Sequence, residues 1–158
     1  IEVDGFTKPG VMRPFGVRGL GEVWLASMNS LTIVPLMHLV GIGDRKATPR
    51  AELAAYAALL KRDDRGRAFL KIMRSFETTA AKQELYVGAL KAANYPTQIV
   101  WGAGDTALPA TRFGAAAREI LPDAKYTELA GKHFFQEDQA PAIGELVAQL
   151  AAQPAGRY

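Results

Sequence analysis

The sequence predicts an α/β fold in which a long helical region is followed by two strand–helix units of a parallel sheet. Residues from about 17 to 94 show helical periodicity and contain no convincing strand. At Tyr95-Pro96 the period changes from helical to extended, and strand and helix patterns then alternate. Such alternation is typical of parallel strands flanked by helices.

The helical region should contain three helices after residue 48. Thr48-Pro49 is typical of an N-cap followed by proline in the first helical position, and it predicts a helix over residues 51–61. Asp63 or Asp64 is expected to cap the next helix, whose apolar stripe consists of Phe69, Ile72, Met73 and Phe76. The third helix has a stripe made of Leu85, Ala89, Leu90 and Ala93.

After residue 95 we expect strands over 97–101 and 125–129 and helices over 109–121 and 141–151. Two parallel strands do not form a stable sheet alone, because each needs a neighbour at its edge and cover on both faces. The sequence therefore implies further strands from an N-terminal segment or from another chain. Residues 1–5 resemble the end of a strand, which favours a missing N-terminal segment.

The composition excludes several classes of protein. The 158 residues are 49% hydrophobic and have a mean hydropathy of −0.02, as in ordinary globular proteins. The absence of cysteine excludes disulfide frameworks and thiolate metal sites, and it fits a cytoplasmic location, which we predict. No apolar run approaches the ~20 residues that a membrane span needs, and no signal peptide is visible, so we expect no membrane partner.

The net charge of +3 and the pI of about 9.3 raise the question of nucleic-acid binding. The densest basic run covers residues 61–67, where Asp63 and Asp64 partly offset four basic residues. We interpret this run as a solvated junction between helices and expect no nucleic-acid partner. The alternative is a basic patch for nucleic acid made by Arg62, Arg65 and Arg67.

Two residues of the C-terminal part suggest acid–base chemistry. His133 lies in the turn 130–136 between an expected strand and helix, where an imidazole can stay solvated and act as a general base. Asp105 follows the preceding strand and could orient that imidazole. The other histidine, His38, lies among apolar residues and is interpreted as a packing residue. Two isolated histidines give no zinc site, so we expect no metal.

Two motifs resemble the α/β-hydrolase superfamily, which includes esterases, epoxide hydrolases and haloalkane dehalogenases. The motif similar to the penultimate strand and acid turn of that family is Pro96-x-x-Ile99-Val100-Trp101-Gly102-x-x-Asp105. The motif similar to its last strand and histidine turn is Leu129-Ala130-Gly131-Lys132-His133-Phe134. The two motifs in this order make the resemblance specific.

The resemblance implies a helical cap followed by the last two β-α units of an α/β-hydrolase parallel sheet. This fold is incomplete, and its sheet would be completed by another segment or chain. Residues 1–16 would then form the strand exit and linker, 17–94 the cap, and 95–158 the C-terminal part of the hydrolase core.

The resemblance also implies a catalytic triad, with His133 as the base and Asp105 as the acid. In some members the acid follows the strand before the cap, which makes Glu2 and Asp4 the alternatives. The nucleophile of the family is a serine or an aspartate in a Gly-x-Ser-x-Gly or Gly-x-Asp-x-Gly elbow, and neither pattern occurs in this chain. The serines lie in helical stretches and are Ser27, Ser30 and Ser75.

We therefore expect part of a hydrolase for an ester, an epoxide or a haloalkane, which needs no cofactor and whose nucleophile lies outside this chain. Its partners would be a small apolar substrate and either the missing N-terminal half or a second copy. Residues that could line the substrate pocket, or else the core of the cap, are Trp24, Phe69, Met73, Phe76 and Phe134. The alternative is a catalytically inactive truncated fragment that oligomerises through its exposed sheet edge.

Overall fold

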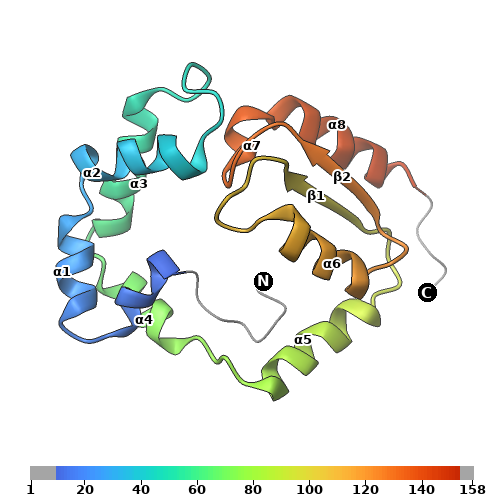
Figure 1. The fold of residues 1–158 in the computed structure, drawn as a ribbon, viewed down its shortest axis with the longest axis horizontal. Coiled ribbons are helices and arrows are strands. Elements are labelled where there is room, and N and C mark those ends of the chain that lie inside the picture. Colours follow the sequence, from blue (N-terminus) through green and yellow to red (C-terminus); the bar gives the residue numbers. More distant parts are fainter. Residues whose placement is uncertain (1–9, 154–158) are drawn as a thin grey trace.

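Helices precede and flank a small sheet in the computed structural model, which describes residues 10–153 (Figure 1). The elements before the sheet are η1 (Gly10–Gly16), α1 (Leu20–Ser27), α2 (Ser30–Leu36), η2 (Met37–Gly41), α3 (Arg50–Lys61), α4 (Arg67–Ser75) and α5 (Ala80–Lys91). Those that follow are β1 (Gln98–Gly102), η3 (Ala110–Gly114), α6 (Ala115–Ile120), β2 (Lys125–Leu129), α7 (Phe135–Asp138) and α8 (Ala140–Ala151). The predicted α/β class is confirmed at this level, and each strand lies within one residue of its predicted range.

Polar side chains mark where two of the helices begin. Before α2, the Asn29 side chain accepts a hydrogen bond from the backbone N–H of Leu31 at 2.8 Å. Before α5, the Thr79 hydroxyl accepts one from the backbone N–H of Lys82 at 3.3 Å. The first N–H groups of a helix have no partner within it, so these side chains satisfy donors that would otherwise depend on water.

The predicted caps of α3 and α4 have different outcomes. Pro49, not Thr48, occupies the cap position of α3, and the Thr48 hydroxyl is buried without a hydrogen-bond partner among residues 10–153. The Thr48 prediction is wrong because Pro49 has an extended conformation, with ψ at 146°, and does not begin the helix. Asp64 does bond the start of α4, where its carboxylate accepts from the N–H groups of Gly66 at 2.8 Å and Ala68 at 2.6 Å.

The helical region has two separate apolar clusters. The first, here called the α1–α4 cluster, is centred on Phe15, Leu25, Leu70 and Met73, with Phe69 packed against it. The second, the α2–α3 cluster, is centred on Val34, Met37, Ile42 and Leu53, with Phe134 from the C-terminal part packed against it. The second cluster therefore includes a residue from the histidine turn.

The apolar stripes predicted for α4 and α5 lie mostly in those helices, but Phe76 and Ala93 fall beyond their ends, and the stripes are only partly buried. On α4, Met73 is 7% exposed and Ile72 is 59% exposed, and Phe76, just after α4, is 57% exposed. No residue of α5 is buried, and Leu85 is 61% exposed. Periodicity predicts which residues share a face of a helix, but the neighbouring elements decide whether that face is covered.

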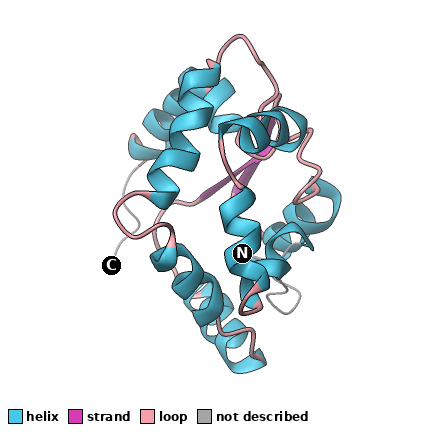
Figure 2. Cartoon of the chain, turned by 90° about the vertical axis from the view of Figure 1, so that its left-hand side faces the viewer, coloured by secondary structure: helices cyan, strands magenta, loops and turns pink. Residues whose placement is uncertain are grey.

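The two strands form a parallel sheet in which Ile99 of β1 lies opposite Tyr126 of β2. On the side of Tyr126, the guanidinium of Arg118 on α6 lies 5.2 Å from the centre of the tyrosine ring. On β1, the Gln98 amide donates to the carbonyl of Leu146 on α8 at 3.0 Å. Adjacent residues of a strand point to opposite faces, so α6 and α8 cover opposite faces of the sheet. Figure 2 shows the two strands lying among helices.

Candidate active site

Asp105 lies in the turn after β1, where its carboxylate is buried and held by backbone groups. Its Oδ1 accepts hydrogen bonds from the N–H groups of Ala107 and Leu108, each at 2.8 Å. Its own N–H donates to the carbonyl of Gly102 at 3.1 Å, and its side chain is 6% exposed. These bonds fix the orientation of the carboxylate and leave Oδ2 for another donor.

That donor is His133, whose Nδ1 lies 2.9 Å from Oδ2 of Asp105. The two residues meet because they follow adjacent parallel strands, whose carboxyl ends lie at the same edge of the sheet. The carboxylate holds the proton on Nδ1, so Nε2 of the neutral imidazole is the proton acceptor. The histidine side chain is 31% exposed, which leaves part of the imidazole open to solvent.

The turns that carry these two residues are packed against each other without side chains between them. The backbone N–H of Gly104 donates to the carbonyl of Gly131 at 2.8 Å. Gly131 has a φ of +142°, a conformation that favours glycine. A Cβ atom at Gly102 would lie 2.4 Å from the carbonyl oxygen of Lys132, so only glycine fits at the end of β1.

The end of η2 binds the histidine turn through four successive carbonyl groups, those of His38, Leu39, Val40 and Gly41. The first two accept from Nζ of Lys132 at 2.9 and 2.8 Å. The third and fourth accept from the backbone N–H groups of His133 at 3.3 Å and Phe134 at 2.8 Å. The last carbonyls of a helix have no partner within it, and here the histidine turn supplies their donors.

Two further bonds join α7 to the helical region. The backbone N–H of Gly43 donates to Oδ2 of Asp138 at 2.7 Å, and the Tyr56 hydroxyl donates to the carboxylate of Glu137. The bond to Glu137 raises the pKa of the Tyr56 hydroxyl above its usual value. The histidine turn and α7 are thus attached to η2, α3 and the loop between them by six hydrogen bonds, at the contact between η2 and α7 in Figure 1.

The five residues predicted to line a substrate pocket lie in different parts of the structure. Phe69 and Met73 belong to the α1–α4 cluster, and Phe134 packs against the α2–α3 cluster. Trp24 and Phe76 are 38% and 57% exposed. Phe134 contacts the catalytic candidate directly, because its ring centre lies 4.9 Å from that of His133. The structure therefore does not gather all five in one cluster.

The serines lie within the helical region, as predicted. Ser27 and Ser75 donate to carbonyl groups of their own helices, each at 2.7 Å, and Ser30 is the first residue of α2. The alternative acids, Glu2 and Asp4, lie outside the described residues.

Sequence reasoning identified His133 and Asp105 but missed Lys132. The acceptors of the Lys132 ammonium are backbone carbonyls 94 and 93 residues earlier in the chain, and a carbonyl group has no signature in a sequence. The Nε2 atom of His38 is buried and has no partner among the described residues, and the carbonyl of His38 bonds Lys132.

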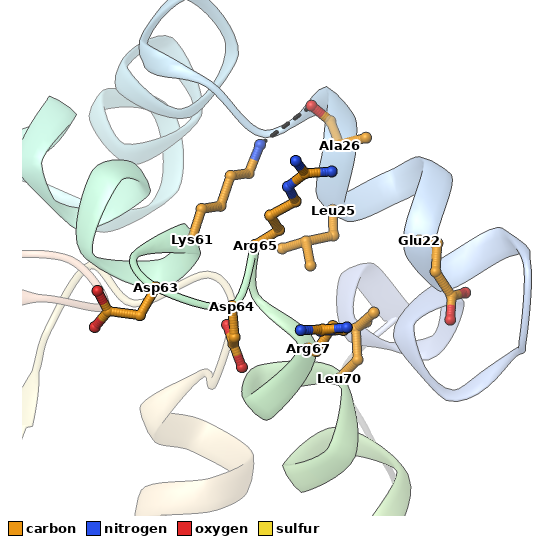
Figure 3. Close-up of a pocket in the computed structure, with 9 residues that line it drawn as sticks. All are labelled: Glu22, Leu25, Ala26, Lys61, Asp63, Asp64, Arg65, Arg67 and Leu70. Carbon is orange, nitrogen blue, oxygen red and sulfur yellow. Dashed lines mark hydrogen bonds between the residues drawn. The ribbon is translucent and has the colours of Figure 1, made fainter.

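A cleft of about 730 Å³ lies away from this pair, between α1 and the loop that joins α3 to α4 (Figure 3). Its charged lining has both signs and consists of Lys61, Arg65, Arg67, Glu22, Asp63 and Asp64. Lys61 is directed at the end of α1, where its Nζ donates to the carbonyl of Ala26 at 3.1 Å (Figure 3). The basic run of the sequence thus shares this cleft with three carboxylates.

Within residues 10–153, no group of three or more histidine, aspartate or glutamate side chains could hold a metal ion. No single helix in that range is long and apolar enough to cross a membrane, although α1 together with the continuous segment Ser30–Gly41 passes on length and composition despite an 87° bend. No family model, curated protein or solved structure matches the chain, so its function has to be inferred from its own residues.

Proposed function

We propose that this chain is the helical cap and C-terminal part of a cofactor-free α/β-fold hydrolase, with His133 as general base and Asp105 as the residue that orients it. The observation that carries the proposal is the 2.9 Å contact between Nδ1 of His133 and Oδ2 of Asp105. Both residues follow parallel strands at the edge of the sheet where α/β folds bind ligands. The resemblance of the two motifs to the hydrolase superfamily supports the same assignment.

In this mechanism Asp105 keeps the proton on Nδ1 of His133 and stabilises the imidazolium that forms when Nε2 takes a proton. The proton comes from a serine nucleophile or from the water that cleaves a covalent intermediate. A serine nucleophile fits an ester substrate, and an aspartate nucleophile fits an epoxide or a haloalkane. The substrate is small and apolar in each case.

The nucleophile comes from outside this chain, either from an N-terminal segment or from a second copy. The two-stranded sheet supports this part of the proposal, because each strand has an outer edge with no ladder partner among the described residues. A further parallel strand that pairs with one of these edges would bring its own carboxyl end, and a nucleophile elbow after it, to the edge that carries His133.

The test is to express the whole open reading frame that encodes these residues and to assay a p-nitrophenyl ester, an epoxide and a haloalkane. We expect turnover of one of the three, and a loss of roughly 10³–10⁴-fold in His133→Ala and Asp105→Asn, because either change removes the oriented base. Glu145→Gln, an exposed position on α8, is the control and should keep full activity. A folded protein that turns over none of the three substrates would contradict the proposal.

Mass spectrometry of the His133→Ala variant identifies the nucleophile. With an aspartate nucleophile, the carboxylate displaces halide from a haloalkane without help from the base, and the resulting ester accumulates because no activated water cleaves it. With a serine nucleophile, the same variant cannot deprotonate the hydroxyl, and no covalent adduct should form.

A second candidate function is favoured by the unpaired sheet edges alone. In this case the chain is an inactive fragment that oligomerises through β1 or β2. Sedimentation of the 158-residue chain over a range of concentrations tests it. A stable dimer without turnover supports the fragment, whereas a monomer, or turnover lost in His133→Ala, eliminates it.

A further inference from the structure

The side chain of Lys132 connects the residue next to the proposed base with the end of a helix in the proposed cap. Its ammonium donates to the carbonyls of His38 and Leu39 at 2.9 and 2.8 Å. We propose that Lys132 is a positioning residue, which sets the orientation of His133 toward Asp105 by binding the C-terminal end of η2. Its catalytic meaning rests on the proposed hydrolase function, but the geometry can be tested without a substrate.

Lys132 is one of two short anchors of this turn on η2, the other being the backbone N–H of Phe134, which donates to the carbonyl of Gly41 at 2.8 Å. The backbone N–H of His133 reaches its own acceptor, the carbonyl of Val40, only at 3.3 Å. The two bonds of the Lys132 ammonium are shorter, and a charged donor strengthens them further. The residue directly before Lys132 is Gly131, which has a φ of +142° and no side chain to restrict its backbone.

Electrostatics favour a cation at this position. The C-terminal end of a helix has a partial negative charge, because its last carbonyls point the same way and lack partners within the helix. An ammonium group has three donors, and Lys132 uses two of them on successive carbonyls of η2. A neutral side chain at position 132 would leave both carbonyls without their charged partner.

Lys132 acts on the base through the backbone of a neighbouring residue. His133 is held at one end by Asp105 and at the other by the path of its main chain along η2. If the turn moves away from η2, the imidazole moves with it, and the 2.9 Å contact with Asp105 is lost for part of the time.

Proton NMR of the complete chain measures this directly. The Nδ1 proton of a histidine bonded to a carboxylate resonates far downfield, and its exchange with water reports how often the bond opens. The chain has two histidines, and Asp105→Asn should remove only the His133 signal, which assigns it. We expect Lys132→Met to speed the exchange of this proton about tenfold, the factor that corresponds to the loss of about one net hydrogen bond.

Three further variants separate positioning from general effects. Lys125→Met removes the same charge from an exposed position on β2 and should leave the exchange at the wild-type rate. Tyr56→Phe removes the bond to Glu137 but keeps that of Lys132, and it should also leave the rate unchanged. Lys132→Arg retains a cation with several donors and should restore most of the protection.

The proposal is overturned if Lys132→Met exchanges at the wild-type rate, or if Tyr56→Phe accelerates exchange to the same extent. If Lys132→Met does not fold, the arginine variant decides, because a folded Lys132→Arg with tenfold faster exchange would equally refute the role. The outcome is independent of turnover: a protein that hydrolyses no substrate but shows the Lys132-dependent protection fails the proposed function and retains the geometric role.

Discussion

Gly102, at the end of β1, shows how little space separates the strand from the histidine turn. A Cβ atom there would lie 2.4 Å from the carbonyl oxygen of Lys132 and 3.1 Å from the ring of Phe135. Because the closest neighbour is backbone, it cannot turn aside as a flexible side chain could. We expect Gly102→Ala to lower the free energy of unfolding by about 1–3 kcal/mol, as other overpacked positions do.

Gly88→Ala is the matched control for this measurement. Gly88 lies within α5, and a Cβ atom there would meet nothing within 4 Å. Alanine should stabilise the helix by about 0.5–1 kcal/mol, because glycine loses more backbone entropy on folding. Urea unfolding followed by circular dichroism measures both variants, and equal stabilities for the two would show that the turn is not packed against β1.

Residues of the candidate site differ in how far the sequence predicts their place in the structure. The proximity of Asp105 and His133 was predictable because each follows a strand, and neighbouring parallel strands end at one edge of a sheet. Lys132, Glu137 and Asp138 were not, because their partners lie far away in the sequence and two of the three bond backbone groups. The fold alone brings those groups together.

At the scale of elements, Arg74 links α4 to η1, to α1 and to the loop between them. Its guanidinium donates to the carbonyls of Phe15 at 3.2 Å and Val17 at 3.4 Å, and it forms an ion pair with Glu22 at 2.9 Å. Glu22 also accepts a bond from the N–H of Gly19 at 2.7 Å. The bond from Arg74 is the main reason that the pKa of Glu22 is lowered from 4.5 to about 2.

This shift predicts how the stability of the α1–α4 part depends on pH. A carboxylate whose pKa is lower in the folded state stabilises the fold fully above its unfolded pKa, and the contribution fades as the pH falls through the folded pKa. The stability advantage of the wild type over Glu22→Gln should therefore be constant at neutral pH and should shrink between pH 4.5 and about 2. Urea unfolding at a series of pH values measures it.

Glu145→Gln on the exposed face of α8 is the control for that series. The difference in free energy of unfolding between Glu145→Gln and the wild type should stay constant over this pH range. The reason is that Glu145 forms no ion pair with a cation among the described residues. Parallel curves for Glu22→Gln and the wild type would show that Arg74 and Glu22 do not interact in solution.

The approximate positions of the elements along the chain were more predictable than their burial. The period of the sequence located α4, α5, α8 and both strands, because periodicity reflects local geometry. It did not predict that Ile72 and Leu85 are exposed, because cover for a helix face comes from distant parts of the chain.

At the scale of the whole molecule, α5 is a long connection with little packing. It is 12 residues long and has no buried residue, whereas α3, of the same length, buries Leu53 and Ala57. Local opening is easiest where few apolar contacts must be broken. We expect hydrogen exchange to be faster in α5 than in α3, measured by mass spectrometry of peptic fragments, and equal protection would contradict this.

The sequence predicted the class of the fold but not its internal division. The change of period after Tyr95 located the sheet, and the strand–helix alternation predicted its parallel order. The separation of the helical region into two clusters could not be predicted, because the α1–α4 cluster joins helices that are not neighbours in the chain and the α2–α3 cluster takes in Phe134 from the C-terminal part.

Six hydrogen bonds join the histidine turn and α7 to η2, α3 and the loop between them. All six therefore involve only one of the two halves of the helical region. The half built on the α2–α3 cluster packs against Phe134 of the turn, directly after His133. The half built on η1, α1 and α4 has its own core and takes no part in those bonds. Movement of the α1–α4 half relative to the histidine turn would therefore break none of these six bonds.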